Sequence, residues 1–326
     1  MSNYESTNQA HCESAAKVDL DDISVSVLVP AYNEQDNITN LLRSILEQDI
    51  RPAKLLEILV DASGSNDNSR DLILEMSKAY QIVSLVDIGK RDGLVASLDR
   101  LLKRARGDLI VRIDGDVRLP PLTLFPLIGR FTDRDVGIVG PRVRVNVTNN
   151  RIVNRIVNAE YELHHLVSQR KPKTTNLQVF RRLDLTIIGS EAEDNLIQHY
   201  IVSTGFKALY DDSVYVVINP PCNVSDLFKQ RARCIRTTRW FKKQMNGTSS
   251  TQSLGCVLPA IVSGLRNKGI VLTDLLMFLT LETITQAYVF ISETLFGHRK
   301  TITWEKLSTV TNKDKRDSAP VTFQHK

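Results

Sequence analysis

The sequence predicts an α/β protein with a mainly parallel sheet, because short β-rich runs alternate with helical patterns along its first third. The β-rich runs lie at 24–29, 55–60, 82–86 and 109–113, and the helical patterns lie at 34–47, 69–80 and 93–106. Helices between strands are typical of βαβ crossovers, which place parallel strands in a sheet covered on both faces. Such sheets bind ligands at the carboxyl ends of their strands. Pro30, Asp61 and Asp114 stand at three of these ends.

Apolar spacing justifies each of these elements in turn. The runs at 24–29, 55–60 and 109–113 are almost continuously apolar, as expected of buried strands. In the first helical pattern the apolar residues recur every three to four positions, at Ile38, Leu41, Leu42 and Ile45. The pattern at 93–106 repeats this with Leu94, Leu98, Leu101 and Leu102.

The second half of the chain is less regular. It predicts short strands at 137–139, 143–147 and 214–218 and a helix over 151–168. Residues 229–243 then hold seven Lys or Arg and no acid, and two apolar stretches follow at 254–265 and 269–296. We therefore expect a tail at 1–22, a catalytic domain at 23–224, a helical extension at 225–300 and a charged tail at 301–326.

Composition sets the broad class of protein. Apolar residues make up 42% of the 326 residues and charged residues 24%, as in an ordinary folded protein. The net charge of +5 is too small to indicate a dedicated nucleic-acid binder. The four cysteines show no CxxC spacing, and the polar N-terminus has no apolar core of a signal peptide. These features predict a cytoplasmic protein.

Asp114-Gly115-Asp116 follows the apolar run at 109–113 and is the strongest candidate for a metal site. Two carboxylates that leave one strand end together can hold Mg²⁺ or Mn²⁺ and leave coordination positions for diphosphate oxygens. The alternative is a solvated Asx turn, because Asp and Gly also dominate ordinary turns.

Five motifs, in order, resemble those of family 2 glycosyltransferases. They are Val29-Pro30-Ala31-Tyr32-Asn33-Glu34, Asp61-Ala62-Ser63-Gly64-Ser65-Asn66-Asp67, Lys90-Arg91-Asp92-Gly93 leading to the DxD at Asp114-Gly115-Asp116, Glu193-Asp194, and Gln230-Arg231-Ala232-Arg233. The resemblance spans residues 24–240 and implies the GT-A fold, a nucleotide-diphospho-sugar donor and inversion at the anomeric carbon. It also favours UDP as the nucleotide.

The resemblance implies a role for each matched residue. Pro30, Ala31, Tyr32, Glu34 and Arg91 would line the donor, and Asp61 would accept a hydrogen bond from the base. Asp116, with Asp114, would hold Mg²⁺ or Mn²⁺ on the diphosphate as a Lewis acid. Pro30 and Tyr32 also have a purely structural explanation, as a strand terminator and a packed aromatic side chain.

Asp194 is the candidate general base, which would take the proton of the acceptor hydroxyl. Glu193 or Glu191 would raise the pKa of Asp194 by like-charge proximity. The same acid-rich segment also reads as a helix start capped by Ser190, and the two interpretations are compatible.

Gln230 and Arg233 would lie near the donor phosphates or the acceptor. Cys234 stands where the family's QxxRW motif has tryptophan, and Trp240 comes six residues later. This departure leaves processive polysaccharide synthesis without support.

The apolar stretch at 269–296 is long enough to span a membrane, but Asp274, Glu282 and Glu293 interrupt it. We expect amphipathic helices that pack on the domain or lie at the cytoplasmic face of a membrane, with peripheral contact. The predicted partners are a nucleotide-sugar and a glycan or lipid-linked acceptor, and no nucleic acid. Two other functions stay open: an inactive GT-A-like scaffold that binds a membrane or a partner protein, and a nucleotidyltransferase. The nucleotidyltransferase would need a glycine-rich phosphate loop, which residues 30–34 lack.

Overall fold

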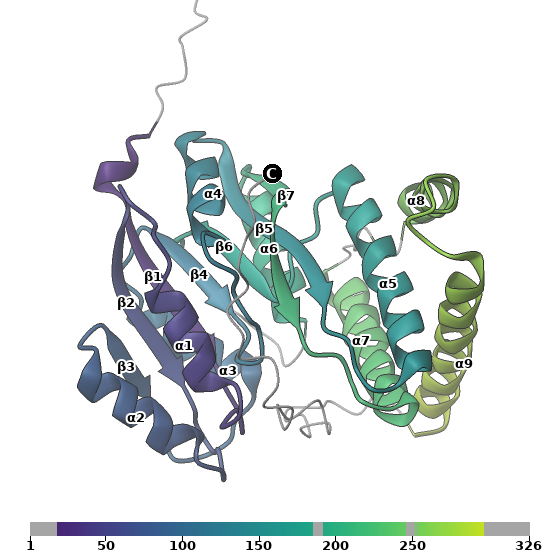
Figure 1. The fold of residues 1–326 in the computed structure, drawn as a ribbon, viewed down its shortest axis with the longest axis horizontal. Helices are drawn as coiled ribbons and strands as arrows, with labels where there is room; N and C mark the ends of the chain where they lie inside the picture. Colours follow the sequence, from purple (N-terminus) through teal and green to yellow (C-terminus); the bar gives the residue numbers. More distant parts are fainter. Residues whose placement is uncertain (1–17, 185–191, 246–250, 252, 297–326) are drawn as a thin grey trace, which may run out of the picture.

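A seven-stranded sheet forms the centre of the protein (Figure 1). The computed structural model describes residues 18–184, 192–245, 251 and 253–296. The strand order is β3-β2-β1-β4-β6-β5-β7. The strands are β1 (Ser24–Pro30), β2 (Lys54–Asp61), β3 (Val83–Val86), β4 (Leu109–Ile113), β5 (Val136–Val145), β6 (Leu177–Arg181) and β7 (Lys207–Ile218).

The sheet is mainly parallel, as predicted. β1 pairs in parallel with β2 and β4, β2 with β3, and β5 with β7. β6 alone among these strands runs antiparallel to both of its neighbours, β4 and β5. The carboxyl ends of β1, β2 and β4 therefore lie at one edge of the sheet, which is where ligands of such sheets bind.

Helices cover both faces of the sheet. They are α1 (Ile38–Leu46), α2 (Ser69–Ala79), α3 (Leu94–Arg104), α4 (Leu124–Gly129), α5 (Arg151–Arg170), α6 (Glu193–Ser203), α7 (Val224–Met245), α8 (Leu254–Arg266) and α9 (Leu272–Phe296). Apolar residues of α1, α2 and α4 share one core cluster with the sheet, while those of α3 and α6 share a second. Two cores on opposite faces of one sheet confirm the predicted α/β class.

Some predicted elements differ from the structure in extent. The strands expected at 137–139 and 143–147 are one strand, β5, and that expected at 214–218 is the end of the longer β7. The helix expected at 34–47 begins only at Ile38, because residues 34–37 form a turn that follows Asn33 in a left-handed conformation. β6 was not predicted.

Four helices form a separate group at one side of the sheet, shown at the right of Figure 1. α5, α7, α8 and α9 bury a shared apolar cluster that includes Val157, Leu227, Ala260 and Phe278. α5 precedes the predicted extension at 225–300 in the chain, yet it packs with that extension. The boundary between catalytic domain and extension stays a prediction.

Candidate active site

A cavity of about 280 Å³ opens at the carboxyl ends of the parallel strands. Pro30 ends β1 directly opposite Asp61, which ends β2, and the Ala31 N–H donates to the Asp61 carbonyl at 2.8 Å. Asp114 follows β4, the neighbour of β1 on the other side. The lining residues used below are Pro30, Ala31, Tyr32, Glu34, Asp61, Arg91, Asp92, Arg100, Asp114, Gly115, Asp116, Asn176, Glu193, Asn219, Gln230 and Arg233. Eleven of the twelve residues predicted for the site therefore line this cavity, and Asp194 is the one that does not.

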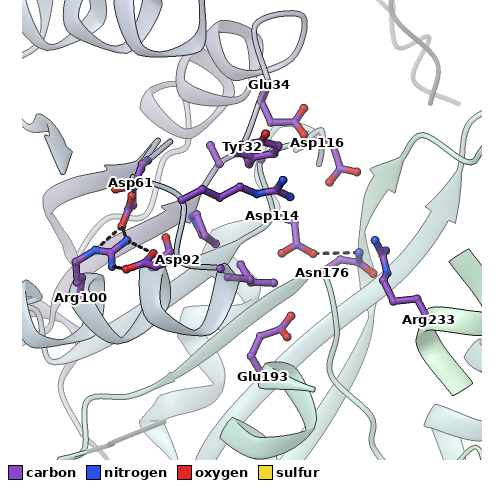
Figure 2. A pocket seen from close by; sticks show the side chains of 18 of the residues that line it. Tyr32, Glu34, Asp61, Asp92, Arg100, Asp114, Asp116, Asn176, Glu193 and Arg233 are labelled. Atoms are coloured by element: carbon purple, nitrogen blue, oxygen red, sulfur yellow. Dashed lines mark hydrogen bonds and ion pairs between the residues drawn. The ribbon is translucent and has the colours of Figure 1, made fainter. Parts of the chain in front are cut away.

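The turn after β4 carries the two aspartates toward the cavity. The Asp114 N–H donates to the Asn176 carbonyl at 3.0 Å, and the Asn176 amide donates to the Asp114 carboxylate at 3.3 Å (Figure 2). Gly115 between them lies against the first motif: a Cβ at this position would stand 3.0 Å from Glu34 Cγ and 3.4 Å from Ala31 Cβ. The small residue therefore lets the turn approach the segment that follows β1.

Arg112 lies beneath this turn and was not identified from the sequence. It is the charged residue of the otherwise apolar β4, and only 1% of its side chain is exposed. Its Nη2 group lies 2.7 Å from Asp114 Oδ1 and 2.8 Å from Glu193 Oε1. One buried guanidinium thus bridges the metal-site candidate on β4 and the acid pair that begins α6.

Burial and crowding of negative charge raise the pKa values of both carboxyls that Arg112 contacts. Burial raises the pKa of Asp114 to about 6, and Asp116 and Asp194 add to the rise, while Arg112 opposes it. Burial and the neighbouring Asp194 raise the pKa of Glu193 to about 7, again against Arg112. Perturbed carboxyls of this kind cluster at functional sites, although structural charge networks also produce them.

The acid pair differs from its prediction in detail. Glu193 is buried and points toward Asp114 (Figure 2), and burial together with the neighbouring Asp194 raises the pKa of Glu193. Asp194 is half-buried, and one of its carboxylate oxygens accepts a hydrogen bond from the Thr175 hydroxyl at 3.0 Å. The helix begins at Glu193, as one interpretation of this segment predicted. Ser190 and Glu191 lie outside the described residues.

A second charged network closes the other end of the cavity. The Arg100 guanidinium donates to Asp61 Oδ2 at 2.7 and 3.0 Å and also contacts Asp92. The other Asp61 oxygen accepts from the Ser63 N–H at 2.8 Å. Because the Asp61 side chain is wholly buried and already bonded, its observed role is to hold Arg100, and a direct bond to a nucleobase would require this network to open.

Tyr32 and Arg91 form a stacked pair on the cavity wall. The guanidinium carbon of Arg91 lies 3.7 Å from the centre of the Tyr32 ring. Gly64 packs against Arg91 so closely that a Cβ there would stand 2.5 Å from the Arg91 backbone, and its φ of +73° suits glycine. The first three motifs therefore meet at one place, with a flat cationic surface over an aromatic ring.

Helix α7 contributes the remaining wall. Gln230 and Arg233 both line the cavity from its first half. Cys234, at the position of the motif tryptophan, is not among the lining residues. Trp240 instead packs beside Ala192, Leu196 and Phe241, against the start of α6. The aromatic side chain thus supports the acid-bearing helix from a different turn of α7.

The residues at the cavity suit a divalent cation that completes its coordination with ligand oxygens. Asp114 and Asp116 supply carboxylates from one turn, and Mg²⁺ is commonly held by one or two carboxylates together with substrate phosphates. Within the described part of the chain, no group of three His, Cys, Asp or Glu side chains is arranged to hold a metal by itself. Both oxygens of Asp114 already have partners, Arg112 and Asn176.

The mainly parallel sheet and the cavity at the ends of its strands are typical of the GT-A type of glycosyltransferase. The family model for glycosyl transferase family 2 matches residues 26–190, half of the chain. The chain therefore belongs to glycosyl transferase family 2, which confirms the family predicted from the five motifs.

Two solved structures similar to this chain are those of a mannosyltransferase and a glucosyl-3-phosphoglycerate synthase. A mannosyltransferase from Pyrobaculum calidifontis, solved with GDP-Man and Mn²⁺, is 21% identical over 86% of this chain and 87% of its own, with a TM-score of 0.56. The glucosyl-3-phosphoglycerate synthase from Mycobacterium tuberculosis, solved with Mn²⁺, UDP and phosphoglyceric acid, is 19% identical over 66% of this chain and 77% of its own, with a TM-score of 0.48. At 21% identity, the similarity to the mannosyltransferase shows the fold alone.

Sequence reasoning missed Arg112, Asn176 and Arg100. Arg112 had one visible signal, because a charge inside an apolar strand must find partners when buried. Asn176 has a φ of +57°, a conformation in which Asn is enriched, but the sequence gives no sign of its contact with Asp114. Arg100 looks like one more basic residue on an amphipathic helix until Asp61 and Asp92 are placed beside it.

Proposed function

We propose that the protein transfers a sugar from a nucleotide-diphospho-sugar, with UDP as the favoured nucleotide, to an acceptor hydroxyl with inversion. The observation that carries this proposal is the meeting of Asp114 and Asp116 with Tyr32 and Arg91 in one cavity at the strand ends. Carboxylates for a cation and a stacked aromatic-guanidinium pair are the two surfaces that a nucleoside diphosphate needs. Membership of glycosyl transferase family 2 supports the same reaction class.

The donor would occupy the side of the cavity formed by the first three motifs. Pro30, Ala31, Tyr32 and Glu34 would line the nucleoside, with Arg91 over Tyr32. Arg100, held by Asp61, would present a fixed guanidinium at the back of this side. A held cation loses little conformational freedom when it binds a polar ligand, which favours affinity.

The diphosphate would lie over the turn after β4. Asp116, with Asp114, would hold Mg²⁺ or Mn²⁺ there, and the bound cation would act as a Lewis acid on the leaving group. Gln230 and Arg233 reach the same cavity from α7 and would contact the phosphates or the acceptor. An arginine suits this position because its guanidinium matches phosphate oxygens in geometry and charge.

Asp194 would act as the general base. The acceptor oxygen attacks the anomeric carbon, the bond from that carbon to the diphosphate oxygen breaks, and the acceptor proton passes to the Asp194 carboxylate. Asp194 is half-buried and its carboxylate accepts hydrogen bonds from the Thr175 hydroxyl and the Asn195 N–H, whereas Glu193 is buried against Arg112. Glu193 would then position the start of α6 and its carboxylate would balance Arg112.

The proposed acceptor is a glycan or a lipid-linked saccharide, and the proposed location is the cytoplasm, at or near a membrane face. Cys222, Cys234 and Cys256 are free thiols, which agrees with a reducing compartment. Residues on α7, beside the cavity, would meet the acceptor, because they lie across from the nucleoside side.

The testing experiment measures metal-dependent donor hydrolysis and transfer over a panel of UDP-, GDP- and dTDP-sugars. GDP-mannose belongs in the panel because the mannosyltransferase of similar fold was solved with it. Asp116→Ala is expected to lose metal-dependent turnover, and Asp194→Asn is expected to lose turnover while it retains nucleotide binding. Glu193→Gln is the matched comparison on the same helix, with an intact neutral partner for Arg112.

The outcomes separate the alternatives. Turnover that survives Asp194→Asn but not Glu193→Gln would transfer the base role to Glu193. Nucleotide binding without turnover on any donor and a broad acceptor panel would favour an inactive scaffold. A complete lack of nucleotide binding by the folded protein would overturn the proposed function.

A further inference from the structure

Helix α9 has apolar side chains on both its inward and its outward side, and its acidic residues lie on the inward side. Its inward positions recur at intervals of three or four, and they include Leu275, Phe278, Glu282, Thr285 and Val289. Its outward positions also carry large apolar side chains, whereas an ordinary surface helix has a polar outer face. The charged residues are therefore turned toward the protein.

Each acid of α9 has an arginine partner on a neighbouring helix. Asp274 lies 2.6 Å from Arg155 of α5, as measured between Oδ1 and Nη2. Glu282 lies 2.8 Å from Arg231 of α7, which also contacts Glu160 of α5. Glu293 lies 3.3 Å from Arg239, further along α7. The acids that interrupt the apolar stretch thus bind α9 to the domain.

Large apolar side chains are exposed along the outer surface of α8 and α9. The exposed side chains are Leu254 (72%), Leu258 (57%) and Val262 (64%) on α8, and Leu272 (55%), Leu276 (53%), Ile284 (56%), Phe290 (61%), Ile291 (55%) and Leu295 (68%) on α9. We call these nine residues the α8–α9 apolar face. Large apolar side chains exposed in this number indicate an interaction surface.

By length and composition α9 could cross a membrane, since Leu272–Leu295 has a mean hydropathy of 1.5 and only 28% of its apolar window is buried. Its neighbours argue against crossing. α5 and α7 lie beside α9 (Figure 1), and they would bring Arg155, Arg231 and Arg239 into the hydrocarbon with it. A helix that lies in the plane of the membrane surface exposes only one face to lipid, as α9 does.

Basic residues border this face at both ends. Arg266 and Lys268 are exposed in the turn between α8 and α9. Lys242 and Lys243 are exposed at the end of α7, beside the end of α9, because Arg239 pairs with Glu293. With the acids of α9 already paired, this border is positive and complements anionic headgroups.

We infer that the α8–α9 apolar face docks on an anionic lipid surface, with α9 in the plane of the interface. Apolar side chains enter the boundary between headgroups and acyl chains, and the four basic residues contact the headgroups. The inference deepens the proposed acceptor class, since it would bring the cavity to a lipid-linked acceptor. It rests on the surface of α8 and α9, and its test needs neither donor nor acceptor.

The test is co-sedimentation of the full-length chain with preformed vesicles, either of phosphatidylcholine alone or with phosphatidylglycerol added. Binding is expected to be stronger with phosphatidylglycerol and to weaken with salt. The double variant Leu276→Glu/Ile284→Glu is expected to bind vesicles at least about tenfold more weakly, because two large apolar side chains no longer enter the lipid. Leu74→Glu is the matched control, an exposed leucine on α2 at the far side of the sheet. Circular dichroism establishes that each variant is folded.

Several results would overturn the inference. One is vesicle binding that the double variant does not weaken. Another is that the wild type does not bind vesicles. This result would overturn the inference whether sedimentation velocity shows a monomer or a dimer formed through this face. A third is bound protein that does not redistribute to added vesicles, which would indicate a spanning helix. Loss of donor turnover in the same preparation would leave the inference unaffected.

Discussion

Replacing Arg112 with methionine tests whether this residue balances the negative charge beneath the site. The substitution keeps a long apolar side chain in β4 but leaves Asp114 and Glu193 without their shared cation. Removing one partner of a buried ion pair costs about 3–5 kcal/mol of folding stability. We expect a loss of this size at about pH 8, where both carboxyls would otherwise be charged.

The loss is expected to shrink as the pH falls. A buried carboxyl with a raised pKa stabilises the folded state most when it is protonated. For Glu193, this contribution is complete below 4.5, its ordinary pKa, and is lost as the pH rises to about 7. At about 1.4 kcal/mol per unit of pKa, the rise in the Glu193 pKa corresponds to roughly 3 kcal/mol of folding stability, which is lost over this pH range. Without Arg112 both pKa values rise further, so the two proteins differ only where the wild-type carboxyls are charged, and the variant should approach the wild type at about pH 5, below both wild-type pKa values.

Urea unfolding followed by circular dichroism, at about pH 8 and about pH 5, measures both quantities. Arg112→Lys is the matched variant, because it retains a cation and should show a smaller loss with little dependence on pH. A loss below about 1 kcal/mol for Arg112→Met, or an equal loss at both pH values, would refute the charge-balance reasoning.

Three further predictions concern the site and the helices beside it. Asp116→Asn should lower metal-dependent turnover about 100-fold or more, because the lost Lewis acid contributes several kcal/mol; a metal titration of activity and calorimetric binding of Mn²⁺ with UDP measure this. Gly115→Ala should cost about 1–3 kcal/mol and weaken nucleotide binding, since the new Cβ would meet Glu34 Cγ at 3.0 Å; urea unfolding and a binding titration test it. Glu282→Gln should cost about 1–3 kcal/mol, because it removes the charge that faces Arg231, and a lower melting temperature would show it.

The sequence was sufficient to predict the first half of the fold because its elements are local. The apolar run at 109–113 is a strand wherever it packs, and the four apolar positions of the first helix all lie in one core cluster. β6 is different, because Leu177–Arg181 pairs antiparallel with strands that lie far from it along the chain. Five residues without a tight turn beside them carry little local evidence of such a pairing.

The same distinction applies to the site. Pro30, Asp61 and Asp114 could be placed together because parallel strands end at one edge, and the structure brings all three to one cavity. The partner of each charge could not be predicted in this way. Asp61 is bonded by Arg100, 39 residues away, and Glu193 by Arg112, 81 residues away. Sequence spacing predicts which groups share an edge, but which oxygens remain open to a ligand depends on packing.

Helix α9 shows how the same limit affects a prediction about membranes. Three acids in an apolar stretch argue against a spanning helix when the sequence is considered alone, because an unpaired carboxylate in lipid is costly. In the structure these acids are paired with arginines of α5 and α7, so they no longer make the outer face polar. A spanning α9 would therefore be unfavourable because of the partner arginines, which are held beside α9 and would be costly to bury in the hydrocarbon. What remains is a helix with one apolar face and basic residues at both ends, a combination suited to the surface of a membrane rather than its interior.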